Sequence, residues 1–245
     1  MRALPASAVL LGALLLGGCG GEHSSGTPDF GTTPTTTTTS TAPEPSDPPD
    51  PTDSVSGTFT SSDEPLPVLD QLLPTGLVPG LNAQWKWQDG DTGTPKSDPL
   101  GVCAKADLPS IGADNVVGRT YFPPDDSDDN AAEQIAEFPD ANTAARAWAV
   151  LKSWHDGCAA RASDHPGLTV GTLTPVAVRS GTARWYLLSW KPAGEETNRY
   201  ESYGMVLTGN RIAVLLIDNS AKRHDYPPGS DPMVGMITAA VGWLH

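Results

Sequence analysis

The sequence predicts an α+β domain over residues 66–245, in which two helices flank one twisted antiparallel sheet. Three observations predict this fold. Short runs rich in β-branched and aromatic residues alternate with Gly, Pro and Asn, as strands and turns do. One long amphipathic pattern near residues 140–161 and an apolar pattern at residues 231–244 have helical spacing. Two helices packed against one antiparallel sheet are typical of the α+β class.

The residues before position 66 differ sharply in composition from those after it. The chain has 245 residues with 25 Gly and 24 Pro, and apart from Phe30 and Phe59 every aromatic residue lies after position 66. Such a segment cannot bury enough apolar surface to fold, so the folded unit has about 180 residues. The net charge of -14, from 29 acidic and 15 basic residues, argues against a nucleic-acid partner, which would need clustered Lys and Arg.

Residues 1–18 have the pattern of a lipoprotein signal peptide. Arg2 gives a positive start, and residues 6–16 form an apolar run that is shorter than the roughly 20 residues a membrane span needs. The next tetrad, Leu-Gly-Gly-Cys at residues 16–19, resembles a bacterial lipobox. The resemblance implies that Cys19 is lipidated and begins the mature chain. We therefore expect a lipid anchor at the extracytoplasmic face of the cell membrane, with an ordinary cleaved signal as the alternative.

After Cys19, the segment up to residue 65 is predicted to be a disordered linker. It is rich in Thr, Pro and Asp, with eight acidic residues and no Lys or Arg from residue 20 onward. A chain of this length spans about 40 Å as a flexible coil and up to about 140 Å as polyproline II. The near-continuous Thr run at residues 32–41 is a candidate for O-glycosylation, and an unmodified spacer is the alternative.

Two cysteines remain in the folded part of the chain, Cys103 and Cys158. An exported chain with two cysteines left is expected to join them in one disulfide. The bond closes a loop of 56 residues, for which chain entropy gives about 4 kcal/mol of stabilisation. A zinc site is excluded because two thiols without a nearby Cys or His pair do not complete a tetrahedron.

The first predicted helix begins after Asp140 as N-cap and continues to about Arg161. Its buried stripe comprises Ala144, Trp148, Leu151 and Cys158, with Trp154 or His155 between the last two. The disulfide therefore joins the inner face of this helix to the sheet region. A second helix, over about residues 231–244, presents Met233, Met236, Ile237, Ala240 and Leu244.

The strands are expected to form a meander. Gly209-Asn210 is a two-residue hairpin turn, so counting outward predicts the pairs Leu207/Ile212, Met205/Val214 and Tyr203/Leu216. Trp185 and Trp190 should lie on opposite faces of their strand. The predicted strands cover residues 116–122, 134–138, 168–178, 183–190, 199–208 and 211–218.

This order of elements resembles the PknH-like extracellular domain, the sensor module of actinobacterial receptor Ser/Thr kinases that also occurs on free-standing lipoproteins. The block FPDANTAARAWAVLKSWHDGC carries the most specific likeness, with Phe138, Ala145, Trp154 and Cys158 at that family's helix positions. The resemblance covers about residues 66–245 and implies an α+β sandwich with a cleft that binds a ligand without catalysis. The chain lacks the second disulfide, kinase domain and transmembrane helix of the kinase-attached form, so direct signalling is not implied.

No catalytic or metal-binding constellation is predicted. The segment Asp126–Glu137 has oxygen ligands at calcium-loop positions, but Ala131 replaces the required Gly, so a solvated acidic loop is expected. Glu133 and Glu137 would lie about 13 Å apart along a strand, too far for a glycosidase pair. The histidines of the predicted domain, at positions 155, 165, 224 and 245, belong to no hydrolase motif.

The candidate ligand-binding residues are Trp85 and Trp87. On one face of a short strand they would lie about 6.6 Å apart, a spacing that suits stacking on a sugar or a flat ligand. They precede a Gly- and Asp-rich segment, residues 89–93, that is expected to be a loop. Packing of both indoles in the core is the alternative.

These observations predict a membrane-anchored extracytoplasmic lipoprotein with a non-catalytic, sensor-type domain and no cofactor. Its expected partners are the membrane, through the lipid anchor, and a small-molecule, glycan or protein ligand. The alternatives are a cell-envelope hydrolase or transferase with a scattered active site, and a structural envelope protein. An enzyme would need a His or carboxylate pair that converges in one pocket, whereas a binding domain needs an apolar or aromatic cleft.

Overall fold

The computed structural model describes residues 67–95, 99–161, 165–220, 226–227 and 229–244. The expected signal peptide, Cys19 and the linker lie outside these residues. Within the described ranges, no helix has both the length and the apolar character needed to cross a membrane.

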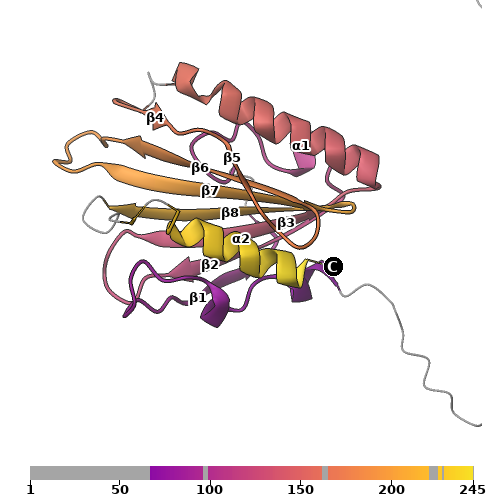
Figure 1. Cartoon of the computed structure of the whole chain (residues 1–245), viewed down its shortest axis with the longest axis horizontal. Helices are drawn as coiled ribbons and strands as arrows, with labels where there is room; N and C mark the ends of the chain where they lie inside the picture. The colour runs from indigo at the N-terminus through magenta and orange to yellow at the C-terminus, as the bar shows by residue number, and fades with distance from the viewer. Residues whose placement is uncertain (1–66, 96–98, 162–164, 221–225, 228, 245) are drawn as a thin grey trace, which may run out of the picture. The chain divides into compact units, whose positions relative to one another are not determined.

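One eight-stranded antiparallel sheet forms the centre of the domain (Figure 1). Its strand order is β1-β2-β3-β8-β7-β6-β4, and β5 also pairs with β6. The bounds are β1 (Gln88–Gly93), β2 (Asn115–Phe122), β3 (Asn130–Glu137), β4 (Thr169–Val170), β5 (Thr174–Val176), β6 (Thr182–Trp190), β7 (Arg199–Thr208) and β8 (Arg211–Ser220).

The long hairpin of β7 and β8 confirms the predicted register. Leu207 pairs with Ile212, Met205 with Val214, and Tyr203 with Leu216. The turn residue Gly209 has a φ of +57°, in the left-handed region that glycine adopts without strain.

The first half of the sheet departs from the sequence prediction. Residues 89–93 form most of β1 and do not form a loop, and β3 begins at Asn130, four residues earlier than predicted. Pairing with β2 and β8 holds these Asp-, Gly- and Ala-rich segments in strand conformation, because partners decide strand formation more than local propensity does. The predicted strand 168–178 is interrupted at residues 171–173 and becomes β4 and β5.

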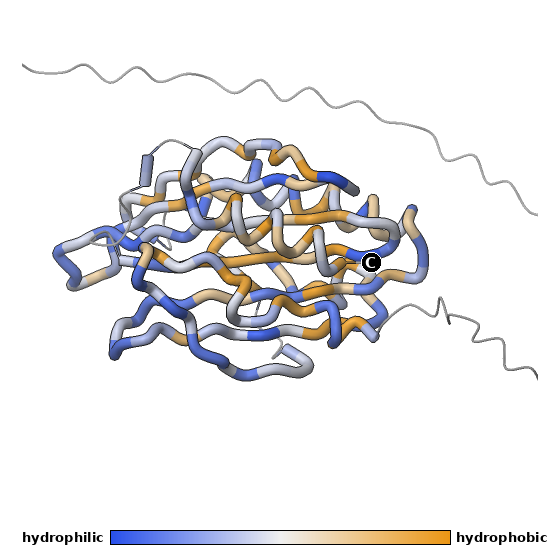
Figure 2. The backbone as a smooth tube through the Cα atoms, turned by 60° about the horizontal axis from the view of Figure 1, so that its bottom comes forward, coloured by the Kyte–Doolittle hydropathy of each residue, from blue (hydrophilic) through white to orange (hydrophobic). Residues whose placement is uncertain are grey.

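The sheet has an apolar core on each face, because successive strand residues point to opposite sides. In β8, Ile212 and Val214 belong to the cluster that includes α1, whereas Ala213 and Leu215 belong to the cluster that includes α2. Figure 2 shows the resulting hydrophobic segments gathered in the centre of the domain. We call these two sides the α1 face and the α2 face.

Helix α1 (Ala141–Asp156) covers part of the α1 face. Asp140 caps its N-terminus by accepting a hydrogen bond from the Thr143 N–H at 2.8 Å, as predicted. The helix ends at Asp156, and a short 3-10 helix, η4 (Cys158–Arg161), completes the predicted range. The buried stripe and the Cys103–Cys158 disulfide are confirmed.

Helix α2 (Pro232–Trp243) crosses β7 and β8 on the other face (Figure 1). Gly204 of β7 permits this close approach, since a Cβ there would lie 2.4 Å from Met233 Sδ. Asp231 caps the helix through the Met233 N–H at 2.8 Å. Trp185 packs against the α2-face core and Trp190 against the α1-face core, which confirms their predicted opposite orientations.

Two irregular segments complete the cover of the sheet. Residues 67–87, with the short helices η1 (Val68–Gln71) and η2 (Thr75–Leu77), pack on the α2 face. Residues 99–113, with η3 (Pro109–Ile111), pack on the α1 face beside α1.

Candidate functional site

The predicted stacking platform is not formed. Trp85 and Trp87 are only 5% and 6% exposed and belong to the α2-face core. Their rings meet edge to face, with centroids 5.3 Å apart. Trp87 Nε1 donates a hydrogen bond to the carbonyl oxygen of Pro79 at 2.8 Å. The predicted ligand platform is therefore wrong. Both indoles are packed in the α2-face core and leave no open ring face for a flat ligand.

The reason for the error is tertiary. The two tryptophans share one side of an extended segment, as expected, but that side faces the sheet core and the segment 75–81 covers it. A small hollow of about 230 Å³ borders Trp85 and Trp87. Sequence spacing gives the shared side of a pair of residues but not the side of the domain to which it turns.

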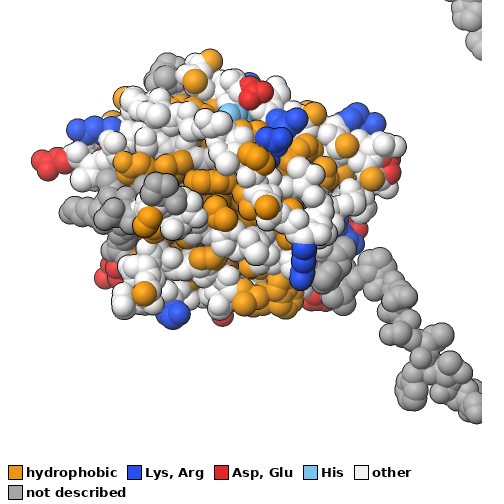
Figure 3. All heavy atoms as spheres, in the orientation of Figure 1, with side chains coloured by type: hydrophobic (Ala, Val, Ile, Leu, Met, Phe, Trp, Pro, Cys, Tyr) orange, Lys and Arg blue, Asp and Glu red, His pale blue; other side chains and the backbone are white. Residues whose placement is uncertain are grey.

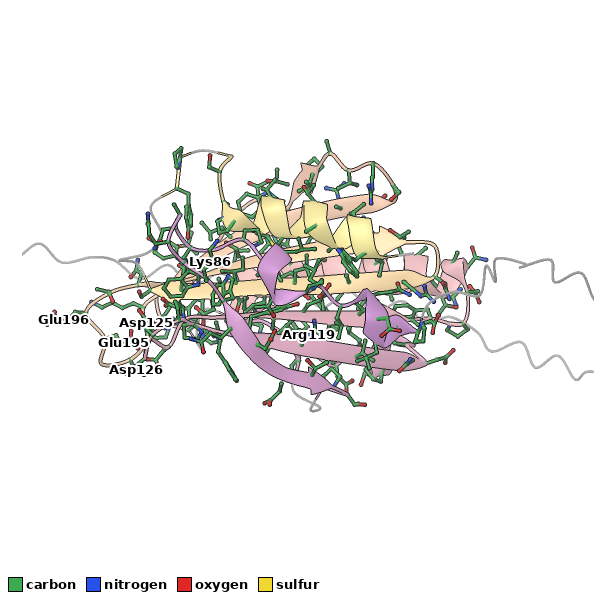
Figure 4. All side chains as sticks on the ribbon, turned by 90° about the horizontal axis from the view of Figure 1, so that it is seen from below. Lys86, Arg119, Asp125, Asp126, Glu195 and Glu196 are labelled. Atoms are coloured by element: carbon green, nitrogen blue, oxygen red, sulfur yellow. A yellow bond between two sulfur atoms is a disulfide. The ribbon has the colours of Figure 1, made fainter. Side chains whose placement is uncertain are left out.

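The acidic loop does not form a calcium site. Its second half, from Asn130 to Glu137, is the regular strand β3, and Glu137 pairs with Arg211 at 2.8 Å. No group of three or more His, Cys, Asp or Glu positioned to hold a metal ion occurs among the residues that the structure describes. Asp125 and Asp126 instead lie at the same end of the sheet as Glu195 and Glu196, on exposed turns (Figure 4).

The described histidines have structural contacts. His155 packs on the Tyr186 ring at 4.7 Å, and its Nε2 lies 2.9 Å from the carbonyl oxygen of Gly171. His165 packs edge to face on Trp190 at 5.7 Å. His224 and His245 lie outside the described residues.

A cleft of about 350 Å³ lies on the α1 face, over the outer strands β2 and β3. The size is within the range of about 300–1,000 Å³ that is common for small-molecule sites. Val116 of β2 and Ala136 of β3 belong to the α1-face core. Gly118 points to the same side of the sheet as Val116, and Ala132 and Gln134 point to the same side as Ala136, so the floor of the cleft is on the α1 face. The cleft is lined by residues of β1, β2 and β3 and of the segment around Pro95 and Leu100. They are Asp91, Thr92, Gly93, Thr94, Pro95, Leu100, Gly118, Arg119, Thr120, Ala132, Glu133 and Gln134.

Small residues create this cleft. Gly118 has no side chain and Ala132 has only a methyl group, so space stays open above the sheet where α1 does not cover it. Ala132 belongs to neither core cluster. A Cβ at Gly118 would lie 3.0 Å from Pro95 Cγ and 3.3 Å from Gln134 Cγ. A larger residue at position 118 would therefore push the wall away from the floor or close the space.

Covalent and polar contacts hold the cleft wall at Leu100. The next residue, Gly101, has a φ of +88°, and a Cβ there would lie 2.9 Å from the Tyr203 ring. The Val102 N–H donates to both carboxylate oxygens of Glu201, at 3.0 and 3.2 Å. Cys103 is fixed by the disulfide to Cys158 of η4, so residues 101–103 form one anchor between the cleft wall, β7 and η4.

Arg161, in η4, strengthens this anchor. Its guanidinium donates to the carbonyl oxygens of Val102 and Ala104, at 3.0 and 2.9 Å. The wall is therefore pre-formed, which reduces the entropy lost when a ligand binds.

Burial strongly changes the acidity of Glu201. The side chain is 3% exposed, and desolvation raises its pKa to about 8. The Val102 N–H opposes this rise, and nearby Asp218 adds to it. Asp218 itself forms an ion pair with Arg199 at 2.8 Å.

A second buried glutamate has a similar role on the α2 face. Glu133 accepts the Leu73 N–H at 2.7 Å and the Tyr121 hydroxyl at 3.2 Å. Burial raises its pKa to about 7, whereas these hydrogen bonds and the charge of Arg119 lower it. Arg119 also donates to the Leu73 carbonyl oxygen at 2.9 Å, so this group attaches residues 67–87 to the sheet.

The burial of Glu133 could have been predicted from the alternation of residues along its strand. The residue alternates with Ala131 and Ile135, so an apolar face carries one carboxylate. Glu201 follows the same rule with Tyr203 and Met205. In both cases the hydrogen-bond donor belongs to a distant irregular segment that the sequence does not identify.

Comparison with known proteins leaves the family open. No protein-family model matches the chain, and neither does any curated protein sequence. Among solved structures, the extracellular domain of PknH from Mycobacterium tuberculosis matches with a TM-score of 0.38 and 13% sequence identity. The match covers 64% of this chain and 84% of that chain. The structural resemblance is weak, so the assignment to a PknH-like sensor family stays a prediction.

Proposed function

We propose that this protein is an extracytoplasmic, lipid-anchored binding protein whose α1-face cleft holds a small ligand without catalysing a reaction. The cleft between Pro95, Leu100 and the floor at Gly118 and Ala132 is the observation that carries the proposal. A pre-formed hollow with apolar walls and a few polar groups is the usual architecture of a ligand site.

The chemistry of the cleft favours a ligand with both apolar and hydroxyl or amide groups. Pro95, Leu100 and Ala132 supply apolar contact area. The half-buried Gln134 amide makes no hydrogen bond to other described residues, so its donor and acceptor are both available to a ligand. The Thr120 hydroxyl already accepts the Asp91 N–H at 2.9 Å.

Location outside the cytoplasm is supported by two independent features. The buried disulfide is typical of an oxidising compartment, where such bonds persist. The tetrad ending at Cys19 supplies the predicted acceptor for the lipid. Together they support the interpretation that the domain is displayed at the outer side of the membrane.

Two carboxylates with raised pKa values would normally suggest acid-base catalysis. Glu201 and Glu133, however, accept backbone N–H groups from segments that cover the sheet. The side chain of Glu133 lies on the α2 face with Leu73 and Tyr121, opposite the cleft. These contacts support structural roles for both groups and hence a binding function for the cleft.

The test is binding of small probes measured by amide chemical-shift changes in the exported chain. Acetonitrile, N-acetylglucosamine and its oligomers are titrated, and shifts are expected to concentrate at Gly118, Ala132 and Gln134. Ala132→Leu fills the cleft and should abolish these shifts. Gln134→Ala should weaken binding of the sugar more than binding of acetonitrile. Ala149→Leu, at an exposed position of α1, is the matched control. Shifts that survive Ala132→Leu in a folded variant, or no shifts in the cleft of the original chain, would contradict the proposal.

A further inference from the structure

The outward side of α2 carries no charge. Helix Pro232–Trp243 contains no acidic or basic residue, although it lies at the surface of the domain. Surface helices normally place charged side chains opposite the core. Figure 3 shows hydrophobic side chains across the face of the domain that carries this helix. The residues of α2 that are exposed or half-buried are Val234, Gly235, Thr238, Ala239, Gly242 and Trp243.

A half-open hollow of about 380 Å³ lies beside the last two turns of α2. One wall comes from Ala239 and Trp243, and the other comes from Val178, which follows β5. All three side chains are only partly buried and pack against the α2-face core. The volume is sufficient for a small molecule, and the walls supply mainly apolar contact.

Arg179 lies at this hollow, where no described residue forms an ion pair with it. The residue is exposed, and its Nη2 lies 3.1 Å from the place where a Cβ of Gly242 would be. Among the residues that the structure describes, Arg179 forms no hydrogen bond and no ion pair. The negative C-terminal end of α2 favours a cation at this position. Its guanidinium donors stay available, although the chain has 29 acidic and only 15 basic residues.

We propose that this hollow binds a single-chain anionic amphiphile. The anionic head would pair with Arg179, and the alkyl chain would lie against Val178, Ala239 and Trp243. A guanidinium matches carboxylate and phosphate oxygens bidentately, whereas the uncharged walls provide nothing for a second ionic group. The hollow and the α1-face cleft are on opposite sides of the sheet, so this inference does not depend on the cleft.

The test uses the exported chain with Cys19→Ala, so that no attached acyl chain competes for the hollow. Decanoate, decyl phosphate and decanol are titrated below their aggregation concentrations by calorimetry. Tryptophan fluorescence, to which Trp243 contributes, is a second signal. At least one anion should bind at one molecule per chain and at least tenfold more tightly than decanol. Tighter binding of decanoate identifies a carboxylate head, and tighter binding of decyl phosphate identifies a phosphate head.

Two substitutions separate charge from shape. Arg179→Gln should reduce the affinity for the anion at least tenfold, to that of the original chain for decanol. Arg179→Lys should reduce the affinity for the anion by a smaller factor. Ala239→Leu fills the hollow and should abolish binding of all three probes. Lys86→Gln removes an exposed positive charge at a different hollow and should change the affinity less than twofold.

Folding of each variant is checked by its thermal melt. Gln134→Ala, in the α1-face cleft, should leave anion binding unchanged, so failure of the cleft proposal and failure of this one are distinguishable. The proposal is wrong if the original chain binds neither anion, or if folded Arg179→Gln binds the anion as tightly as the original chain. It is also wrong if Ala239→Leu leaves the affinity unchanged.

Discussion

The Glu201 carboxylate and the Val102 N–H join the cleft wall to the centre of the sheet, at 3.0 and 3.2 Å from the two carboxylate oxygens. The two residues are 99 positions apart in the chain. Val102 lies directly before the disulfide cysteine Cys103, so a hydrogen bond and a covalent bond hold neighbouring residues to different elements. The wall at Leu100 therefore has a fixed position relative to β7 and η4.

We predict that the free energy of unfolding falls as the pH rises from 5 to 9. Unfolded glutamate ionises near pH 4.5, whereas Glu133 and Glu201 have folded-state pKa values of about 7 and about 8. Between these pH values the folded state holds more protons than the unfolded state. For each extra proton held, the free energy of unfolding falls by up to about 1.4 kcal/mol as the pH rises by one unit. Urea unfolding at several pH values measures the slope. A stability that rises with pH across this range would contradict it.

Glu201→Gln tests the contribution of one of these groups. The amide oxygen can still accept the Val102 N–H, but the side chain no longer ionises. We expect stability near pH 5 to change by less than about 1 kcal/mol. The fall in stability between pH 6 and pH 9 should become shallower than in the original chain. An unchanged slope would show that Glu201 does not titrate in this range.

Glu133→Leu should destabilise the domain by about 1–3 kcal/mol, because it leaves the buried Leu73 N–H without an acceptor. Glu133→Gln keeps an acceptor of similar size and is the matched control. Hydrogen exchange of the Leu73 amide gives a local readout, with faster exchange expected in the leucine variant only. Equal exchange rates in both variants would count against the role of Glu133 in holding residues 67–87.

Removal of the disulfide by Cys103→Ala and Cys158→Ala together should lower the free energy of unfolding by about 4 kcal/mol. The bond closes a long loop and joins the cleft wall to η4. Denaturant unfolding of the double variant, compared with the reduced original chain, gives the size of the effect. A midpoint that neither change shifts would rule out a stabilising role.

Gly204→Ala should destabilise the domain by about 1–3 kcal/mol through overpacking beneath α2. The added Cβ would lie 2.4 Å from Met233 Sδ and 3.1 Å from Ile237 Cγ1. Gly76→Ala is a suitable control, because a Cβ there meets no atom within 4 Å and the residue has no positive φ. Thermal melts of the two variants should separate clearly, and equal midpoints would contradict the packing argument.

Cys19→Ala should move the protein from the membrane fraction to the soluble or secreted fraction. The reason is the predicted loss of the only lipid acceptor that the sequence provides near the signal peptide. Detergent phase separation and labelling with a palmitate analogue measure the change. Continued partition into the detergent phase would refute lipid anchoring at this residue.

The sequence by itself determined the elements in which local chemistry decides the structure. The Asp140 cap, the buried stripe of α1 and the Gly209-Asn210 turn with its register are all local patterns, and the structure confirms them. The disulfide also followed from the sequence, because Cys103 and Cys158 are the two cysteines of the predicted folded part. Helical spacing and turn geometry fix these features within a few residues, so no distant partner is required.

Only the tertiary structure decided which surfaces are buried and which are hollow. Trp85 and Trp87 share one side of their segment, but the fold turned that side into the core. The β1 strand formed from a Gly- and Asp-rich segment because β2 supplied its hydrogen-bond partners. The α1-face cleft depends on Gly118 and Ala132 from neighbouring strands and on Pro95 and Leu100 from a distant segment. Contacts between residues far apart in the chain decide burial, and the spacing of residues along one segment does not encode them.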